Sequence, residues 1–284
     1  MGMNILTFDI EDWYNCDFVS ENFDWSQYEV RIYDGVDRIL EELGKQKLKG
    51  TFFCLGWLAE NHPAVIRRIY DAGHQIGCHS YQHQLSTRFT RKQFQEDTNK
   101  AKQLLEDVIG DKVEAFRAPG FSITQNNLWA FDVLAELGFK YDSSVFPSYH
   151  DYGGMPNYGV AEPVILKTAT SDIKEFPINI YKMLGRNLVF SGGGFFRLLP
   201  YPLIERLTEK SPYVMTYFHP RDFDPHQPIM EELPRLRKFK SYVGLKTAFG
   251  KFQKFLNDFE FVNIQQADQQ IDWSQIRTIN CDRI

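Results

Sequence analysis

The stretch GTFFCLGWLAENHPAVIRRIYDAGHQIGCH, residues 50–79, contains the local order on which the fold depends. Residues 50–55 and 74–79 are short runs rich in β-forming side chains, whereas residues 62–72 repeat their apolar side chains with the period of a helix. A strand, a helix and a second strand in this order predict two parallel strands joined by a crossover helix.

The same alternation extends over the rest of the chain. Further strands are predicted at residues 4–9, 114–119, 139–142, 164–169, 173–178, 187–190, 213–219 and 259–264. Further helices are predicted at residues 32–46, 90–109, 126–137, 201–210 and 244–257. The series indicates an α/β fold, either a barrel or an open doubly wound sheet, and periodicity does not separate the two. Because no repeat or long linker interrupts it, residues 1–284 are predicted to form a single domain.

The bulk composition excludes several classes of protein. With 32 basic and 37 acidic residues the net charge is −5, which argues against a general nucleic-acid binder. No segment has the apolar length of a membrane span, and the first residues lack the apolar core of a signal peptide, so a cytoplasmic protein is expected. The cysteines are scattered and form no CxxC pair, which predicts free thiols at Cys16, Cys54, Cys78 and Cys281.

Chemically versatile side chains fall at or just past the carboxyl ends of predicted strands. These residues are Asp9, His79, Arg117, Asp142 and His219. Parallel α/β folds place their active sites at this edge of the sheet. The sequence therefore predicts one cleft to which these residues contribute.

The first candidate site is a metal centre. His79 and His83 stand four residues apart and could reach one metal ion, although two solvated loop histidines are the alternative. Asp9, Glu11 and Asp12 offer carboxylates, and alternation along a strand sends Asp9 and Glu11 to one face. The alternative for this segment is an acidic loop exposed to water.

Two further residues could act beside such a centre. The Arg117 guanidinium could hold a carboxylate ionised and oriented, or it could form a purely structural ion pair. His219 follows an apolar strand, where a histidine near a metal could act as a general acid, or it could be a hydrogen-bonded core residue.

Six segments in a fixed order carry a family resemblance: TFDIED, TFFCLGW, AGHQIGCHSYQH, FRAPGFS, YDSSVFP and YFHP. Together they resemble the polysaccharide deacetylases of the NodB-homology group, also called carbohydrate esterase family four. The segments GGGFFRLLPY, HPRDFDPHQP and YVGLKTAFGKFQKFL resemble a subgroup linked to bacterial exopolysaccharide loci, with residues 220–284 as its C-terminal extension.

The resemblance implies a fold and a set of roles. The fold would be a distorted (β/α) barrel of about seven parallel strands. Asp9 would be the catalytic base, oriented by Arg117, and His219 would be the general acid. His79 and His83 would bind a divalent metal, with zinc the best fit and cobalt, nickel or iron as substitutes.

The third metal ligand is less determined, because many relatives have two adjacent aspartates where this chain has DIED. Asp12 is the favoured ligand, since a D-x-E-D arrangement resembles the subgroup, and Glu11 is the alternative.

Several residues beside the motifs are candidates for contacts with a sugar or for support of the site. Trp13, Tyr81 and Phe121 could stack on a sugar ring, with a place in the core as the alternative. Asp142 could support His219 or Arg117, or it could simply form a turn. The run RLRKFK, residues 235–240, could meet a phosphate of a lipid-linked or nucleotide sugar, or it could be a solvated face.

The leading prediction is a metal-dependent hydrolase that removes N-acetyl groups from an N-acetylated saccharide. One alternative keeps the fold and acts on a small amide or cyclic ureide. The other is a carbohydrate-binding protein without turnover, which would not require a base, a metal site and an acid together.

Overall fold

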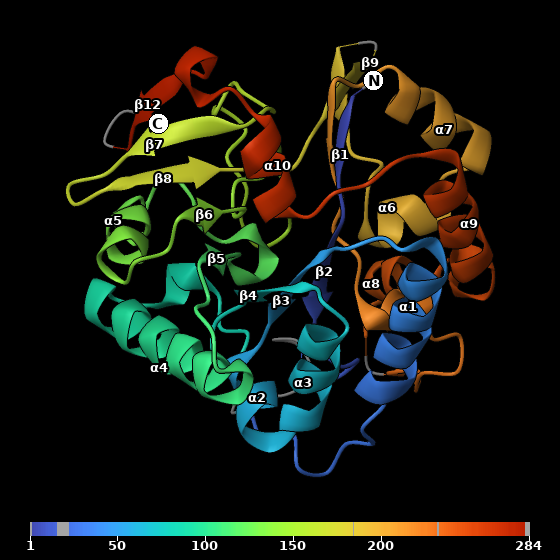
Figure 1. The fold of residues 1–284 in the computed structure, drawn as a ribbon. Coiled ribbons are helices and arrows are strands. Elements are labelled where there is room, and N and C mark those ends of the chain that lie inside the picture. Colours follow the sequence, from blue (N-terminus) through green and yellow to red (C-terminus); the bar gives the residue numbers. More distant parts are fainter. Residues whose placement is uncertain (1, 16–22, 184, 232, 282–284) are drawn as a thin grey trace.

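Figure 1 shows the chain as a computed structural model that describes residues 2–15, 23–183, 185–231 and 233–281. Cys16, one of the predicted free thiols, lies outside the described residues. Cys54 and Cys78 are buried free thiols, and Cys281 is also buried.

Six strands pair side by side, all parallel, and form the centre of the molecule. In sheet order they are β2 (Thr7–Ile10), β3 (Thr51–Cys54), β4 (Gln75–Cys78), β5 (Ala115–Phe116), β6 (Tyr141–Asp142) and β8 (Asp172–Glu175). The predicted strand–helix–strand unit is thus confirmed. At the far edge, β7 (Val164–Lys167) runs antiparallel to β8, and β12 (Thr278–Asn280) pairs with β7.

A seventh parallel strand curls the sheet toward a barrel. β11 (Tyr213–Met215) pairs with β1 (Met3–Ile5), and farther along Phe218 bridges Phe8 in β2. Across the remaining side, the Tyr213 hydroxyl donates to the Pro177 carbonyl at 2.9 Å. The expected distorted barrel of parallel strands is confirmed in this form.

Helices cover the outside of this barrel (Figure 1). They are α1 (Ile32–Gln46), α2 (Gly56–Asn61), α3 (Pro63–Asp71), α4 (Arg91–Ile109), α5 (Trp129–Glu136), α6 (Gly193–Leu198), α7 (Tyr201–Glu209), α8 (Arg235–Tyr242), α9 (Leu245–Asp258) and α10 (Ile264–Gln270). The hairpin of β9 (Tyr181–Met183) and β10 (Arg186–Leu188) stands apart. Phenylalanines fill the space between sheet and helices, for example Phe8, which stacks on Phe52 at 4.6 Å and meets Phe252 of α9 edge-on.

The helix predicted at 62–72 is confirmed as α3, and the structure differs from the local predictions just before it and near the carboxyl end of the chain. It is preceded by a separate helix, α2, because Pro63 cannot donate its backbone nitrogen and begins a new helix, α3. The strand predicted at 259–264 is reduced to a single bridge between Val262 and Ile5, and β12 was not predicted.

Candidate metal centre and active site

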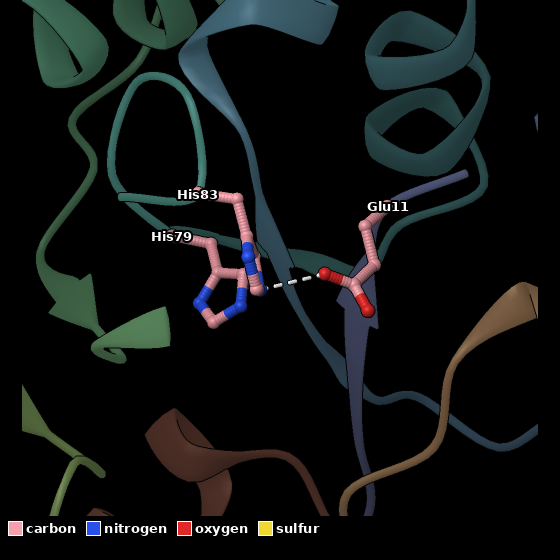
Figure 2. A group of neighbouring side chains, drawn as sticks. All are labelled: Glu11, His79 and His83. Atoms are coloured by element: carbon pink, nitrogen blue, oxygen red, sulfur yellow. Dashed lines mark ion pairs between the residues drawn. The ribbon is translucent and has the colours of Figure 1, made fainter. Parts of the chain in front are cut away.

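Glu11, His79 and His83 converge at the carboxyl edge of the sheet, and we call these three residues the metal-ligand cluster. Glu11 follows the end of β2, and both histidines lie in the loop that follows β4. One ligand atom from each residue lies within 4.8 Å of the other two. Figure 2 shows both imidazoles turned toward the Glu11 carboxylate, whose Oε2 is 2.8 Å from His83 Nε2.

The loop, rather than a helical turn, brings the two histidines together. Ser80 and His83 adopt left-handed backbone conformations, with φ of 66° and 58°. The Ser80 hydroxyl accepts a hydrogen bond from the His83 backbone nitrogen at 3.0 Å, and Asp97 accepts one from the Tyr81 nitrogen at 3.0 Å. These bonds hold a tight turn that folds His83 back beside His79.

The donor set fits a divalent metal. His79 Nδ1 lies 2.7 Å from the Arg117 carbonyl oxygen, and since a carbonyl only accepts, Nδ1 carries the proton and Nε2 presents its lone pair. Burial lowers the pKa of His79 to about 4, so the ring is neutral near pH 7. Glu11 Oε2 is buried and pairs with His83 Nε2 at 2.8 Å, so both atoms lie where two ligands of one ion would.

Asp12, the favoured third ligand, is placed elsewhere, and this choice is corrected. Its Oδ1 accepts from the Trp13 backbone nitrogen at 2.7 Å, and its Oδ2 accepts from the nitrogens of Arg31 and Ile32 at 2.7 and 2.8 Å. Burial raises the pKa of Asp12 to about 6, although these N–H donors favour the charged form. Asp12 therefore ties the β2 loop to the start of α1, and Glu11 is the carboxylate beside the histidines.

The Glu11 carboxylate is ionised. Its burial alone would raise the pKa, but the adjacent His83, together with His219 and His79, lowers it to about 2. An anionic oxygen and two imidazoles at one point form the kind of ligand set that holds a catalytic zinc.

Asp9 and Arg117 meet beside the cluster, although β3 and β4 separate β2, which contains Asp9, from β5, which precedes Arg117. Arg117 Nη1 donates to Asp9 Oδ1 at 2.7 Å and to the Thr7 hydroxyl at 2.8 Å. Ser143 accepts from the other side, through its hydroxyl at 2.9 Å and its carbonyl at 3.2 Å. Because the guanidinium is fully buried on the Phe53 ring, at 4.3 Å, its orientation is fixed.

His219 completes the group from the segment beside β2, where Phe218 bridges Phe8. Its Nε2 lies 3.6 Å from Glu11 Oε1 and 3.9 Å from Asp9 Oδ2. Its Nδ1 is 3.0 Å from Asp222 Oδ2, which fixes the ring so that Nε2 faces the cluster. Burial opposes protonation of His219, but the charge of Asp222 outweighs it and raises the pKa.

Asp222 and Arg197 are functional candidates that sequence reasoning missed. Arg197 Nε lies 2.9 Å from Asp222 Oδ1, both side chains are buried, and Arg197 and His219 together bring the pKa of Asp222 to about 2 against its burial. The segment HPRDFDP carried a usable signal, since His219 and the aspartate three residues on form a capping pair, with a proline at the first position of the turn. The local sequence GGGFFRL contains no pattern that predicts the contact between Arg197 and Asp222.

Asp142 supports Arg117 indirectly. Its carboxylate accepts from the Ser144 hydroxyl at 2.7 Å and from the Ser144 nitrogen at 2.8 Å, and Ser144 Oγ in turn accepts from the Ala118 nitrogen at 2.9 Å. Through Ser144, Asp142 thus fixes the backbone of Ala118, the residue that follows Arg117. Its neighbour in the sheet, Glu175, is a buried carboxyl that the sequence reading did not single out.

Of the three aromatic residues predicted to stack on a sugar, one lines the cavity and two pack elsewhere. Phe121 lines the cavity beside the cluster, together with Tyr217. Trp13 packs edge-on against Tyr14 and donates its indole nitrogen to the Glu29 carbonyl at 2.9 Å. The Tyr81 hydroxyl bonds Glu60, and the Lys100 ammonium lies 3.5 Å from the Tyr81 ring centroid. Trp13 and Tyr81 therefore serve the packing around the site.

The cluster, Asp9 and His219 open into one cavity of about 250 Å³. Its walls come from both halves of the chain, with Phe121 on one side and Arg197 and Tyr217 on the other. A carboxylate with two imidazoles, a second, oriented carboxylate and an imidazole with a raised pKa in one cavity are suited to hydrolysis of a polarised carbonyl.

Two family matches divide the chain. Residues 5–141 match the family described as Polysaccharide deacetylase, and residues 143–269 match one described as Domain of unknown function (DUF3473). The first contains the metal-ligand cluster, Asp9 and Arg117, whereas the second contains His219. Within the described parts of the chain, no helix combines the length and the apolar character needed to cross a membrane.

Curated relatives match part of the chain. A peptidoglycan deacetylase of Helicobacter pylori is 31% identical over 162 residues, which cover 52% of this chain and 53% of that protein. A peptidoglycan-N-acetylglucosamine deacetylase of Bacillus cereus is 33% identical over 94 residues, 33% of this chain and 34% of that protein. The chain thus spans about half or less of the length of these relatives.

Solved structures share the fold at low identity. A structure described as a putative polysaccharide deacetylase from Mycobacterium smegmatis superposes with a TM-score of 0.66 at 19% identity, covering 97% of this chain and 92% of that one. A family-four pseudoenzyme from Bacillus anthracis superposes with a TM-score of 0.51 at 15% identity, covering 93% and 64%. Residues 5–141 therefore belong to the polysaccharide deacetylase family, and the chain as a whole has the fold that these structures share.

Proposed function

We propose that the protein is a metal-dependent hydrolase that removes N-acetyl groups from an amino sugar of a polysaccharide or its precursor. The observation that carries this proposal is the meeting of the metal-ligand cluster, the Asp9–Arg117 pair and His219 in one cavity. A sugar-binding protein without turnover would need neither an oriented carboxylate nor a histidine with a raised pKa beside the cluster.

Glu11, His79 and His83 would hold the metal, with zinc the best fit and cobalt, nickel or iron as substitutes. When bound, such an ion supplies Lewis acidity toward the acetamide carbonyl and lowers the pKa of water to about 7. Because the chain provides three ligands from two separate loops, the arrangement is that of a catalytic rather than a closed structural site.

Asp9 is placed to accept a proton from the attacking water. Arg117 occupies Asp9 Oδ1 and leaves Oδ2 facing His219 across 3.9 Å. The guanidinium, with Thr7 and Ser143 as its other partners, prevents the carboxylate from rotating. A fixed carboxylate oxygen beside the reacting centre provides general base catalysis, a contribution of about 10²- to 10⁴-fold.

His219 is placed to return a proton to the departing nitrogen. Asp222 accepts the Nδ1 proton, so the second proton of the imidazolium sits on Nε2, toward the cavity. As the carbonyl carbon–nitrogen bond breaks, the nitrogen takes this proton and leaves as a free amine, while the carbonyl carbon leaves as acetate. The raised pKa of His219 keeps the acid protonated at higher pH than a free histidine would be.

The saccharide and its setting belong to the same proposal. The Helicobacter and Bacillus relatives are named for peptidoglycan, whereas the segments around residues 192–256 resemble the exopolysaccharide subgroup. We place the substrate among N-acetylated exopolysaccharides or their precursors, with residues 220–284 as an extension of a single catalytic domain. A cytoplasmic location stays a prediction from the amino-terminal sequence.

The test is acetate release from chitin oligomers by the zinc-loaded protein. We expect turnover by the wild type, with Asp9→Asn retaining zinc and losing turnover. Hydrolysis of small amides alone would favour the alternative amide or ureide substrate, and saccharide binding without release of any product would favour the binding protein. Unchanged turnover in Asp9→Asn would remove Asp9 from the role of base.

A further inference from the structure

The cavity that contains the metal-ligand cluster also has a basic side. Arg221, Arg237 and Lys240 line it, and we call these three side chains the basic rim. Arg237 and Lys240 lie on α8, and Arg221 lies in the short turn that follows His219. Besides Arg197, which pairs with Asp222, a chain with a net charge of −5 thus gathers three further cations at this cavity.

We propose that the basic rim binds an anionic group, a carboxylate or a phosphate, on the same saccharide whose acetamide reaches the metal-ligand cluster. This inference rests on the proposed function and narrows its substrate to acidic N-acetylated saccharides. Charged side chains that converge on a cavity attract ligands of opposite charge and fix their orientation.

Arg237 stands beside an aromatic ring that lines the same cavity. Its guanidinium carbon lies 5.0 Å from the centroid of the Tyr152 ring. A guanidinium held in this way directs its donors along its own plane, where a carboxylate or phosphate can accept two of them. A ring next to a cation matches an acidic sugar, which has an apolar face and a charged edge.

Lys240 has a partner that an anionic ligand can replace. Its ammonium lies 2.8 Å from Asp151 Oδ2, and the two side chains are 55% and 57% exposed. An ion pair this exposed contributes little to stability, so exchange of Asp151 for a ligand carboxylate or phosphate costs little. The buried Arg197 differs, because its charge is matched by Asp222.

The position of α8 suits contact with a polymer. Each residue of α8 is at least partly exposed, so the helix presents its basic side chains without losing core packing. Meanwhile the Arg197 guanidinium donates to the carbonyls of Lys240, Ser241 and Val243 at 2.8 to 3.0 Å, which fixes the end of α8 against the site. The rim is therefore anchored as well as accessible.

The test compares binding of three probes to the zinc-loaded Asp9→Asn protein, which does not consume them. They are a neutral chitin tetrasaccharide, a tetrasaccharide that alternates glucuronate with N-acetylglucosamine, and a nucleoside diphosphate N-acetylglucosamine. Calorimetry is expected to show at least one anionic probe binding about tenfold tighter than the neutral one. Preference for the glucuronate probe identifies a carboxylate, and preference for the nucleotide sugar identifies a phosphate.

The basic rim is tested by adding Arg237→Gln or Lys240→Gln to this protein. Each is expected to reduce the anionic preference about threefold or more, and added salt is expected to weaken it. Arg235→Gln is the matched control, because it removes the same charge from the same helix at a residue outside the cavity lining. It should retain the preference.

Equal affinity for neutral and anionic probes would overturn the basic rim as a subsite, and so would an equal loss in Arg235→Gln. The outcome is separable from the proposed function, which depends on acetate release by the wild type. Binding with the expected preference, but no acetate from any of the three probes, would retain the subsite and reject the deacetylase.

Discussion

Glu11 and Asp12 are adjacent acidic residues with different contacts. Their side chains point to opposite sides because successive side chains alternate along a strand. The period of two places Asp9 and Glu11 on the side of β2 that faces the cavity, and this much could be predicted from DIED. The three backbone hydrogen bonds that Asp12 accepts could not be predicted, because two of them come from Arg31 and Ile32, about twenty residues away.

Substitution of these two residues distinguishes their roles. Glu11→Gln is expected to lower zinc affinity at least about tenfold, because the amide brings no charge to the ligand set. Asp12→Asn is the matched control and should retain zinc while losing stability, since its amide nitrogen cannot accept a backbone N–H. Metal content after dialysis, measured by mass spectrometry, checks both. Zinc loss in Asp12→Asn alone would restore Asp12 as the ligand.

Asp222 is expected to act through His219. Asp222→Asn should lower kcat about 10- to 100-fold with little change in KM and in zinc content, because the amide no longer holds the imidazole in its protonated, oriented form.

The matched control is Asp224→Asn, which breaks the ion pair with Arg31 at 2.6 Å two residues further on. It is expected to lower the melting temperature without a comparable loss of kcat. If both variants lose kcat in proportion to their stability, Asp222 is merely structural.

At the scale of secondary structure, predictions succeeded where a pattern was both local and repeated. The strand and helix sequence over residues 50–79 reads correctly because β3 and β4 are buried along their length and α3 buries one apolar face. β12 was missed because its three residues are stabilised only by pairing with β7, more than a hundred positions earlier. The bridge at Val262 depends in the same way on distant Ile5.

The pairing of β6 with β8 brings two buried carboxyl groups together. Asp142 and Glu175 are register partners, and burial together with the Asp142 charge raises the pKa of Glu175 well above 4.5. The other ionisable groups facing Glu175 are Arg117, which acts in the opposite direction, and the buried phenols Tyr158 and Tyr213. The Glu175 carboxyl therefore stays protonated to a higher pH in the folded protein than in the unfolded chain.

This arrangement predicts a pH-dependent stability. A carboxyl with a raised folded pKa contributes fully below its unfolded value of 4.5, and the contribution is lost as pH rises toward the folded value. Relative to wild type, Glu175→Gln should gain up to about 1.4 kcal/mol in unfolding free energy per pH unit above 4.5. Urea unfolding from pH 5 to 8 measures this difference. Parallel curves for the two proteins would contradict it.

For the molecule as a whole, the two family matches share one site. The first supplies the metal-ligand cluster and Asp9, and the second supplies His219, Asp222 and Arg197. Sequence motifs predicted the residues at the strand ends, because parallel strands direct their carboxyl ends to one edge. The motifs did not reveal Arg197, whose contact with Asp222 exists only after β11 closes against β1.

Because the ligands come from loops after β2 and β4, metal binding should stabilise the whole fold. Zinc at about 100 times its dissociation constant is expected to add about 2.7 kcal/mol to the unfolding free energy. Thermal melts of the wild type with zinc and with a chelator measure the shift, and His83→Ala should show little of it. An equal shift in His83→Ala would place the metal elsewhere.

The hydrogen bonds of Arg197 have a consequence for how proteins with this arrangement can diversify. One guanidinium fastens the end of α8 and, through Asp222, also the ring of His219. The helix proposed to bind the saccharide and the imidazole proposed to protonate the leaving amine are therefore positioned by the same side chain. A relative that changes its saccharide specificity through substitutions in α8 must therefore also preserve the position of the His219 imidazole.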